Sequence, residues 1–133
     1  MKISTRGRYA LRVMIDLAEN SNGEYIAMRE IAARQDISLK YLERILPSLV
    51  EAGIIEGMQG KGGGYRLLKS PKEISVGDVL RLTEGELAPV SCTSCGTAPC
   101  VRTADCRTKP VWDELRRRID EYLDGVHIAD LMK

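Results

Sequence analysis

The chain has 133 residues, enough for one compact body with a few helices and a small sheet. Its 20 basic and 19 acidic residues leave a net charge of +1, which does not by itself indicate a nucleic-acid partner. The basic surplus lies in residues 1–70, with 11 Lys and Arg against 8 Asp and Glu, whereas residues 71–133 carry 9 against 11. No run of about 18 apolar residues and no apolar segment behind Met1-Lys2 is present, so we expect a cytoplasmic protein without a membrane span or secretory signal.

Three helices are predicted within the first fifty residues. Apolar residues recur at three- and four-residue spacing between Thr5 and Asn20, and a second helix is expected over 28–34. Ser38 is placed to cap a third helix by accepting a hydrogen bond from a free N–H group at its start. The apolar stripe of this third helix consists of Leu42, Ile45, Leu46 and Leu49. Two short helices joined through the tight connection 35–37 are typical of a helix-turn-helix.

Pro47 interrupts the pattern of the third helix. Its nitrogen cannot donate to the carbonyl group of Glu43, and an interior proline costs on the order of 3 kcal/mol. We therefore expect a kink or a break at this position. Gly53 is expected to end the helix as a left-handed cap.

A small β-hairpin is predicted directly behind the third helix. Residues 54–56 and 65–68 have the composition of two short strands. The glycine-rich loop 57–64 between them is too long for a two-residue turn. A glycine-rich loop on such a hairpin, placed behind a helix-turn-helix, is typical of a wing.

The C-terminal half is expected to contain a short helix, a long loop and a long helix. Ser75 can cap a helix over Val76–Thr83, and residues 84–108 then lack apolar periodicity, which in a loop of that length usually indicates function or disorder. Pro110 suits the start of a helix whose narrow apolar seam predicts pairing with a second subunit. The seam consists of Trp112, Leu115, Ile119, Tyr122 and Val126. Residues 127–132 are expected to pack back onto the body.

All four cysteines lie between positions 92 and 106, in the pattern Cys92-x2-Cys95-x4-Cys100-x5-Cys106. In a reducing compartment such a cluster indicates metal binding or redox chemistry rather than a disulfide framework. Soft thiolates suit iron–sulfur clusters, and a tetrahedral zinc site built from the same four thiolates is chemically open as well. A third interpretation makes Cys92 and Cys95 a dithiol switch that works without metal.

Four segments resemble the Rrf2 family of bacterial transcription regulators, and the resemblance covers nearly the whole chain. These segments are Met1–Arg12, Ile37–Glu43, Gly60–Tyr65 and Cys106–Trp112. The cysteine set favours the iron–sulfur (IscR-like) branch of the family over its nitric-oxide-sensing and cysteine-metabolism branches. The resemblance implies a mainly α fold with a small β-hairpin wing, that is, a winged helix-turn-helix plus a long C-terminal dimerisation helix.

The same resemblance implies an organisation and a function. It divides the chain into a DNA-binding domain (1–83), a cysteine-bearing cofactor loop (84–108) and a dimerisation helix with a C-terminal segment (109–133). The expected partners are double-stranded operator DNA and a second copy of the chain, and the expected targets are genes of iron–sulfur cluster biogenesis. No nucleophile–base pair, Gly-Lys-Ser/Thr motif or carboxylate pair is found, so we expect no enzyme. The alternative from another class is a protein-docking module with a winged fold.

The candidate DNA-binding residues lie on the third helix and on the wing. A helix in the major groove reaches base edges with the residues at its start. The helix residues in this position are Ser38, Leu39, Lys40, Tyr41 and Arg44, and the wing residues are Gln59, Gly60 and Lys61. Because the family often has arginine where this chain has Gln59, phosphate contacts of Lys61 are expected in place of minor-groove readout. Arg6, Arg8 and Arg12 either add backbone contacts or are simply solvated.

The resemblance also implies which cysteines hold a cofactor. Its three-cysteine pattern corresponds to Cys92, Cys100 and Cys106, with a [2Fe-2S] cluster favoured over a [4Fe-4S] cluster. The family's fourth ligand, a histidine or an aspartate, corresponds here to Lys109 or Arg8, neither of which ligates iron in its charged form. Cys95 is the obvious substitute, and Glu43 or an external ligand are the alternatives. Zinc and a metal-free thiol switch remain open beside the cluster.

Overall fold

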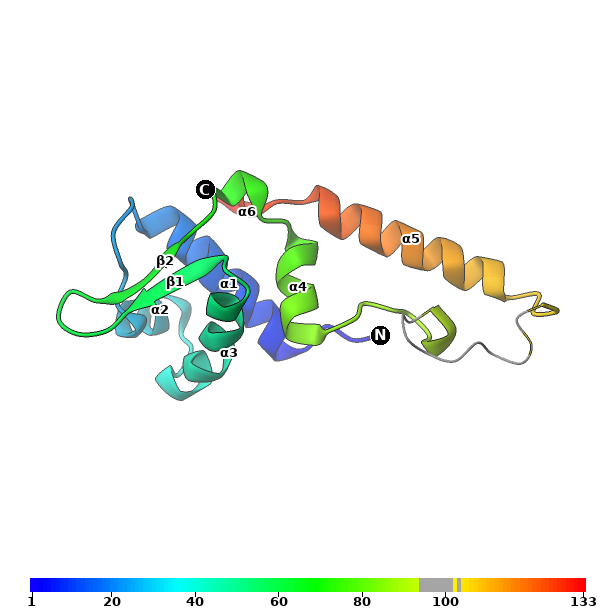
Figure 1. The fold of residues 1–133 in the computed structure, drawn as a ribbon, viewed down its shortest axis with the longest axis horizontal. Helices are drawn as coiled ribbons and strands as arrows, with labels where there is room; N and C mark the ends of the chain where they lie inside the picture. The colour runs from blue at the N-terminus through cyan, green and yellow to red at the C-terminus, as the bar shows by residue number, and fades with distance from the viewer. Residues whose placement is uncertain (94–101, 103) are drawn as a thin grey trace.

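The computed structural model describes residues 1–93, 102 and 104–133, which form a helical body and a long helix that extends from it (Figure 1). The helices are α1 (Thr5–Asn20), α2 (Met28–Gln35), α3 (Leu39–Glu51), α4 (Val76–Glu84), α5 (Lys109–Gly125) and α6 (Ile128–Leu131). Two single turns of 3-10 helix, η1 (Pro71–Glu73) and η2 (Ser91–Thr93), and the strands β1 (Ile55–Met58) and β2 (Gly64–Leu67) complete the described elements. We call α1–α4, the hairpin and α6 the body, and η2 with α5 the arm.

Serine caps fix the starts of three body helices. The Ser38 hydroxyl accepts from the backbone N–H of Tyr41 at 3.1 Å, and the Ser75 hydroxyl accepts from that of Asp78 at 2.9 Å, both as predicted. Ser4 caps α1 in the same way. The predicted bounds of α1 are confirmed, and α2 and α4 each extend one residue beyond their predicted ends.

One apolar core holds the body together. It joins the inner faces of α1, α2 and α3 to β1 and α6. Its largest side chains without exposed surface include Met14, Leu17, Ile31, Leu42, Ile45, Leu46, Leu49, Ile55 and Ile128. Burial on this scale is the main favourable contribution to folding.

The structure corrects the expected break at Pro47. Helix α3 is continuous from Leu39 to Glu51 with Pro47 inside it. Each of the four stripe leucines and isoleucines is completely buried, and full burial of such a side chain contributes about 1.5–3 kcal/mol. Their sum exceeds the cost of one interior proline, on the order of 3 kcal/mol. Gly53, with φ of +77°, ends the helix as the expected left-handed cap.

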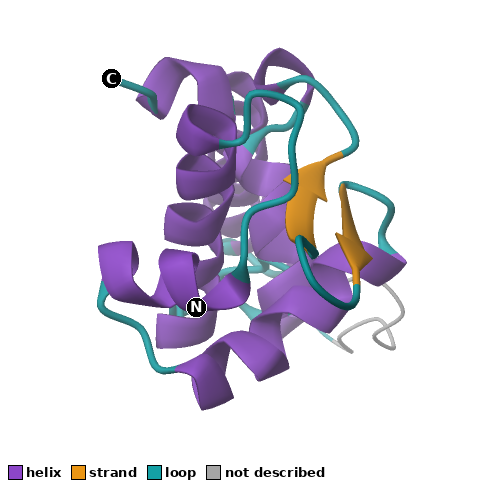
Figure 2. Ribbon diagram, turned by 90° about the vertical axis from the view of Figure 1, so that its left-hand side faces the viewer, coloured by secondary structure: helices purple, strands orange, loops and turns teal. Residues whose placement is uncertain are grey.

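The hairpin is antiparallel, with Glu56 opposite Arg66 and Met58 opposite Gly64. The strands reach further into the glycine-rich segment than predicted, so the loop contracts to residues 59–63. Ile26 adds a short bridge, exchanging two backbone hydrogen bonds of 2.8 Å with Tyr65. Figure 2 shows the hairpin along one side of the helices.

The apolar seam predicted for α5 faces in two directions within the single chain. No residue of α5 is fully buried in the single chain. Ile119, Leu123 and Val126 pack against a small cluster on α4 and Leu87 of the same chain, whereas Leu115 and Tyr122 are 40% and 70% exposed. The seam therefore divides into an inner edge, which docks α5 on the body, and an outer edge, which the single chain leaves open.

Helix α6 returns to the body as predicted. Ile128 is completely buried, and its N–H donates to the carbonyl of Ile74 at 2.9 Å. Within the described residues, no helix is both long and apolar enough to span a membrane.

Candidate nucleic-acid interface and cysteine segment

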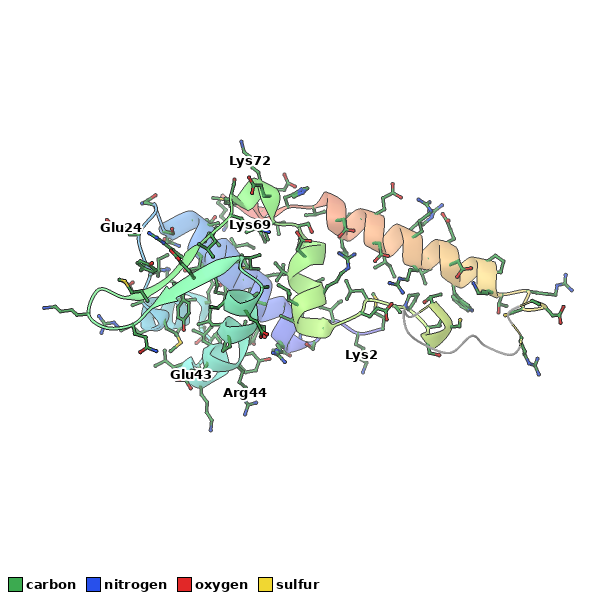
Figure 3. All side chains as sticks on the ribbon, in the orientation of Figure 1. Lys2, Glu24, Glu43, Arg44, Lys69 and Lys72 are labelled. Atoms are coloured by element: carbon green, nitrogen blue, oxygen red, sulfur yellow. The ribbon has the colours of Figure 1, made fainter. Side chains whose placement is uncertain are left out.

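The start of α3 presents a polar surface to solvent. Leu39 is 46% exposed, and Lys40, Glu43 and Arg44 are exposed as well. Figure 3 shows Glu43 and Arg44 projecting from α3 away from the body. These side chains lie where a helix entering the major groove would meet base edges.

Two of the predicted contact residues also have structural roles. The Ser38 hydroxyl is engaged as the cap of α3. Tyr41 is half-buried and packs edge-to-face against Tyr9 of α1, with ring centroids 5.5 Å apart. The ring of Tyr41 therefore fixes α3 against α1, which leaves Lys40 and Arg44 as the freer side chains.

An ion pair between a buried carboxylate and an exposed arginine sets the position of α2, and the sequence patterns did not predict it. Asp16 of α1 is 1% exposed and accepts from the guanidinium of Arg34 at 2.8 and 2.9 Å and from Gln35 at 3.0 Å. The hydrogen bond to Asp16 raises the pKa of Arg34. Arg12 adds a hydrogen bond of 3.2 Å to the Gln35 side chain. The turn between α2 and α3 is thereby tied to α1.

The wing has an exposed tip and a rigid base. Gln59, Gly60 and Lys61 are exposed at the tip. At the base, Arg66 donates to Glu56 at 2.5 Å and lies over the ring of Tyr25, 4.4 Å from its centroid. The Arg66 hydrogen bond, with one from the Tyr25 hydroxyl, lowers the pKa of Glu56. This cluster ties the hairpin to the connection between α1 and α2.

The described part of the cysteine segment lies in the arm, in η2 and directly before α5. Cys92 in η2 is exposed and Cys106 is half-buried, while Cys95 and Cys100 lie outside the described residues. Cys106 Sγ lies 3.4 Å from the Thr108 hydroxyl, and hydrogen bonds from that hydroxyl and from backbone N–H groups at the start of the helix lower the pKa of Cys106. In the described part of the chain no three metal-ligating side chains come together.

Lys109 links the two described cysteines electrostatically. The pKa of Lys109 is raised, first by its hydrogen bond to Asp113 and further by the thiolate charges of Cys92 and Cys106. The charges of both sulfurs therefore act on the Lys109 ammonium in the same direction as Asp113 does. Glu43, in contrast, lies on the far side of the body from η2 and α5 (Figure 3), so within one chain it is remote from these cysteines.

A series of polar contacts connects this segment to α1. Arg116 of α5 donates to Glu86 at 2.7 Å and to the carbonyl of Thr93 in η2. Arg81 of α4 pairs with two α5 carboxylates, those of Asp120 at 3.1 Å and Asp124 at 2.6 Å. The end of α4 is then tied to the start of α1, because Glu84 accepts from the hydroxyl and the backbone N–H of Ser4 at 2.6 and 2.9 Å.

Helix α3 is capped at its start and packs on α1 and α2. An antiparallel hairpin with a glycine-rich tip follows it, and together these elements define a winged helix-turn-helix protein. The family described as Rrf2, iron-dependent transcriptional regulator, matches residues 3–133. The chain belongs to this family of transcriptional regulators.

Known relatives agree with this assignment. The chain is 36% identical over 132 residues to the HTH-type transcriptional regulator IscR of Aliivibrio salmonicida, covering 99% of this chain and 77% of the relative. It is 38% identical over 133 residues to the protein rrf2 of Nitratidesulfovibrio vulgaris, covering 100% and 88%. Among solved structures, CymR, the global cysteine regulator of B. subtilis, matches with a TM-score of 0.79, 34% identity and coverage of 98% and 95%. The IscR of T. potens matches with a TM-score of 0.75, 34% identity and coverage of 98% and 85%.

Proposed function

We propose that this protein is a homodimeric, DNA-binding regulator that senses iron–sulfur status through a cysteine-ligated cluster and controls genes of iron–sulfur cluster biogenesis. The observation that carries the proposal is that Cys106 directly precedes α5 while Arg116 of α5 binds the carbonyl of Thr93, the residue after Cys92, and that the charged contacts of α5 lead back to α1. Similarity to the IscR proteins supports iron–sulfur chemistry over other signals.

DNA binding is assigned to the start of α3 and the tip of the wing. We propose that Arg44, with Tyr41, discriminates sequence, that Ser38, Leu39 and Lys40 complete the helix contacts, and that the wing residues 59–61 add phosphate affinity. A base-edge contact is worth about 1–3 kcal/mol at one position, whereas a phosphate contact releases counterions on any sequence.

The test compares two alanine variants on selected operator DNA and on mixed-sequence duplex. Lys61→Ala is expected to weaken both complexes equally, and Arg44→Ala is expected to reduce the preference for the operator. The opposite pattern would show that the two roles are exchanged. If the wild type binds duplex DNA without steep salt dependence, a protein-docking module becomes the better function.

The donor set fits an iron–sulfur cluster in its chemistry. Cys92, Cys100 and Cys106 would hold the cluster, and Cys95 or an external ligand would supply the fourth position. Thiolates are the usual ligands of such clusters, and the groups that lower the pKa of Cys106 favour its ligating form. A bound cluster would supply a redox-active and labile centre, with [2Fe-2S] favoured. The role of this chain's own residues is to transmit the state of the cysteine segment through Arg116 to α5.

Anaerobic purification with iron and sulfide analysis and an absorption spectrum tests the cofactor. We expect a brown protein whose visible absorption is lost when Cys92, Cys100 or Cys106 is changed to serine. Cys95→Ser separates two ligand sets, because it shifts the spectrum only if Cys95 is the fourth ligand. A Cys100→Ser variant that retains a full and stable cluster would contradict the three-cysteine assignment.

A metal-free thiol switch is the second candidate, and two observations favour it. The fold is similar to that of CymR, described as a global cysteine regulator, and the lowered pKa of Cys106 is typical of a reactive thiol. Such a protein would be colourless after anaerobic purification, and its DNA binding would respond to oxidant and to thiol reductant. A zinc site would be colourless too, but its DNA binding would respond to chelator.

A further inference from the structure

The structure separates three arginines of α1 that have similar positions in the sequence. Arg12 is used inside the body, where its guanidinium bonds to Gln35 of α2. Arg8 bonds within its own helical turn, to the hydroxyl of Thr5 at 3.1 Å. Arg6 alone of the three reaches the helix that carries the candidate DNA contacts.

Two hydrogen bonds to α3 hold the guanidinium of Arg6 through one of its nitrogens. Its Nη2 donates to the Ser48 hydroxyl at 3.0 Å and to the carbonyl of Arg44 at 3.4 Å. Among the described residues, both of these hydrogen bonds use Nη2, and Nη1 and Nε make none. The guanidinium is thereby oriented while retaining donors for a further acceptor, the arrangement in which arginine binds phosphate bidentately.

These free donors face an open pocket that carries positive charge. Arg6, Tyr41 and Arg44 line a pocket of about 390 Å³ between the start of α1 and α3. No carboxylate is among its lining residues, and the ion pairs found in the described part of the chain involve neither arginine. Arg6, which has no carboxylate partner among the described residues, thus offers Nη1 and Nε to one anionic group, and the guanidinium of Arg44 adds positive charge at the rim.

We propose that this pocket binds a backbone phosphate of duplex DNA, with Arg6 as its anchor. The proposal rests on the proposed DNA-binding function and adds a contact from α1, outside the helix and wing residues assigned above. Because Arg6 also holds the backbone of α3 at Arg44, a phosphate on Arg6 would fix the depth of α3 in the groove. Arg44 remains free to extend from the rim of the pocket to a base edge.

The experiment measures the salt dependence of binding to a labelled mixed-sequence duplex and to operator DNA selected from a random pool. Loss of one phosphate contact lowers the slope of log K against log salt by about 0.9. Arg6→Gln removes one such contact from each half-site of a dimer, so the slope is expected to fall by about 1.8 on both duplexes, with affinity reduced roughly 60-fold at about 0.1 M salt by the same relation. The ratio of operator to mixed-sequence affinity is expected to stay unchanged.

Arg8→Gln is the matched control, because it removes the same charge from the same turn of α1. It is expected to change the slope much less than Arg6→Gln does. Equal changes in the two variants would overturn the pocket, since diffuse charge would then explain the effect, but would leave the proposed DNA-binding function intact. Absence of duplex binding by the wild type would instead overturn the proposed function itself.

A second variant keeps the proposal testable if Arg6→Gln does not fold. Arg6→Lys keeps the charge but loses the planar set of donors, so it is expected to retain the wild-type slope with weaker affinity. Circular dichroism and the thermal midpoint report whether each variant is folded. If Arg6→Gln does not fold, replacing single phosphates by uncharged methylphosphonates in the operator decides the question. The wild type should then lose more affinity than Arg6→Lys at one phosphate in each half-site, and equal losses at every phosphate would overturn the proposal.

Discussion

The body and the arm are held by different kinds of interaction. The body has a continuous apolar core in which side chains such as Leu46 and Ile55 have no exposed surface. Helix α5 has no fully buried residue, and it is attached by the small cluster around Leu87 and by ion pairs of Arg81 and Arg116. Apolar burial gives the body one arrangement, whereas exposed ion pairs are individually weak. The segment that carries the cysteines is thus joined to the arm, whose displacement from the body costs less free energy than opening of the apolar core.

The largest effect is expected in the body. Leu46→Ala removes a completely buried side chain from α3 and should lower the free energy of unfolding by about 2–5 kcal/mol. Leu68→Ala, the same change at a side chain that is 51% exposed, should stay within about 0.5 kcal/mol. Denaturant unfolding followed by circular dichroism measures both. Similar losses in the two variants would show that the core does not dominate the stability of the body.

The second effect concerns the outer edge of α5, which we propose as a dimer contact. Leu115→Glu places a charge on this edge and is expected to convert a dimer into a monomer at micromolar concentration. Leu131→Glu on α6 is the matched control, because the two leucines are 40% and 41% exposed. Sedimentation velocity gives the answer. A wild type that is already monomeric, or a control that dissociates equally, would contradict the assignment of this edge.

The third effect tests how the arm is attached. Arg81→Ala removes both ion pairs between α4 and α5, with an expected cost of about 0.5–1 kcal/mol for docking of the helix. Amide hydrogen exchange in α5 should accelerate while exchange in α3 stays unchanged. Arg117→Ala is the control, because the ion pairs of Arg117 within the described residues are with Glu114 and Glu121 of its own helix. Faster exchange throughout the body would show that arm and body are a single cooperative unit.

The elements that the sequence predicted well are those with local causes. Periodic apolar residues marked α1 over its full length, and the serines at 38 and 75 marked helix starts, because a cap interacts within three residues. The break expected at Pro47 is absent for the converse reason. The local cost of the proline is outweighed by burial against partners distant in sequence, which a local pattern does not contain.

The sequence predicted the types of residue in the candidate site, but not the contacts that hold these residues against other elements. The helix and wing residues are exposed except for the half-buried Tyr41, while the roles of Arg6, Arg66 and Arg116 depend on partners on other elements. Arg6, for example, bonds to α3 across 38 and 42 positions. Alternating charges on α5 also gave no indication of which arginine faces α4 and which faces solvent. Only the packing of the helices decides such pairs.

The smallest effect is the pH dependence of α5. Glu114 accepts from Arg117 at 2.6 Å and from Arg118 at 2.9 Å, and these hydrogen bonds, that of Arg117 first, lower the pKa of Glu114 to about 2 from an ordinary 4.5. Because the folded pKa is depressed, the contribution of Glu114 to helix stability is complete above pH 4.5 and is lost as the pH falls toward 2. An NMR titration of the Glu114 carboxyl should therefore give a midpoint near 2 at low salt, rising toward the ordinary value in about 1 M salt as the charges are screened. Glu114→Gln should remove the corresponding loss of α5 helicity while the acid transition of the body persists. A midpoint near 4.5 at low salt would show that the pairs of Glu114 with Arg117 and Arg118 are not formed in solution.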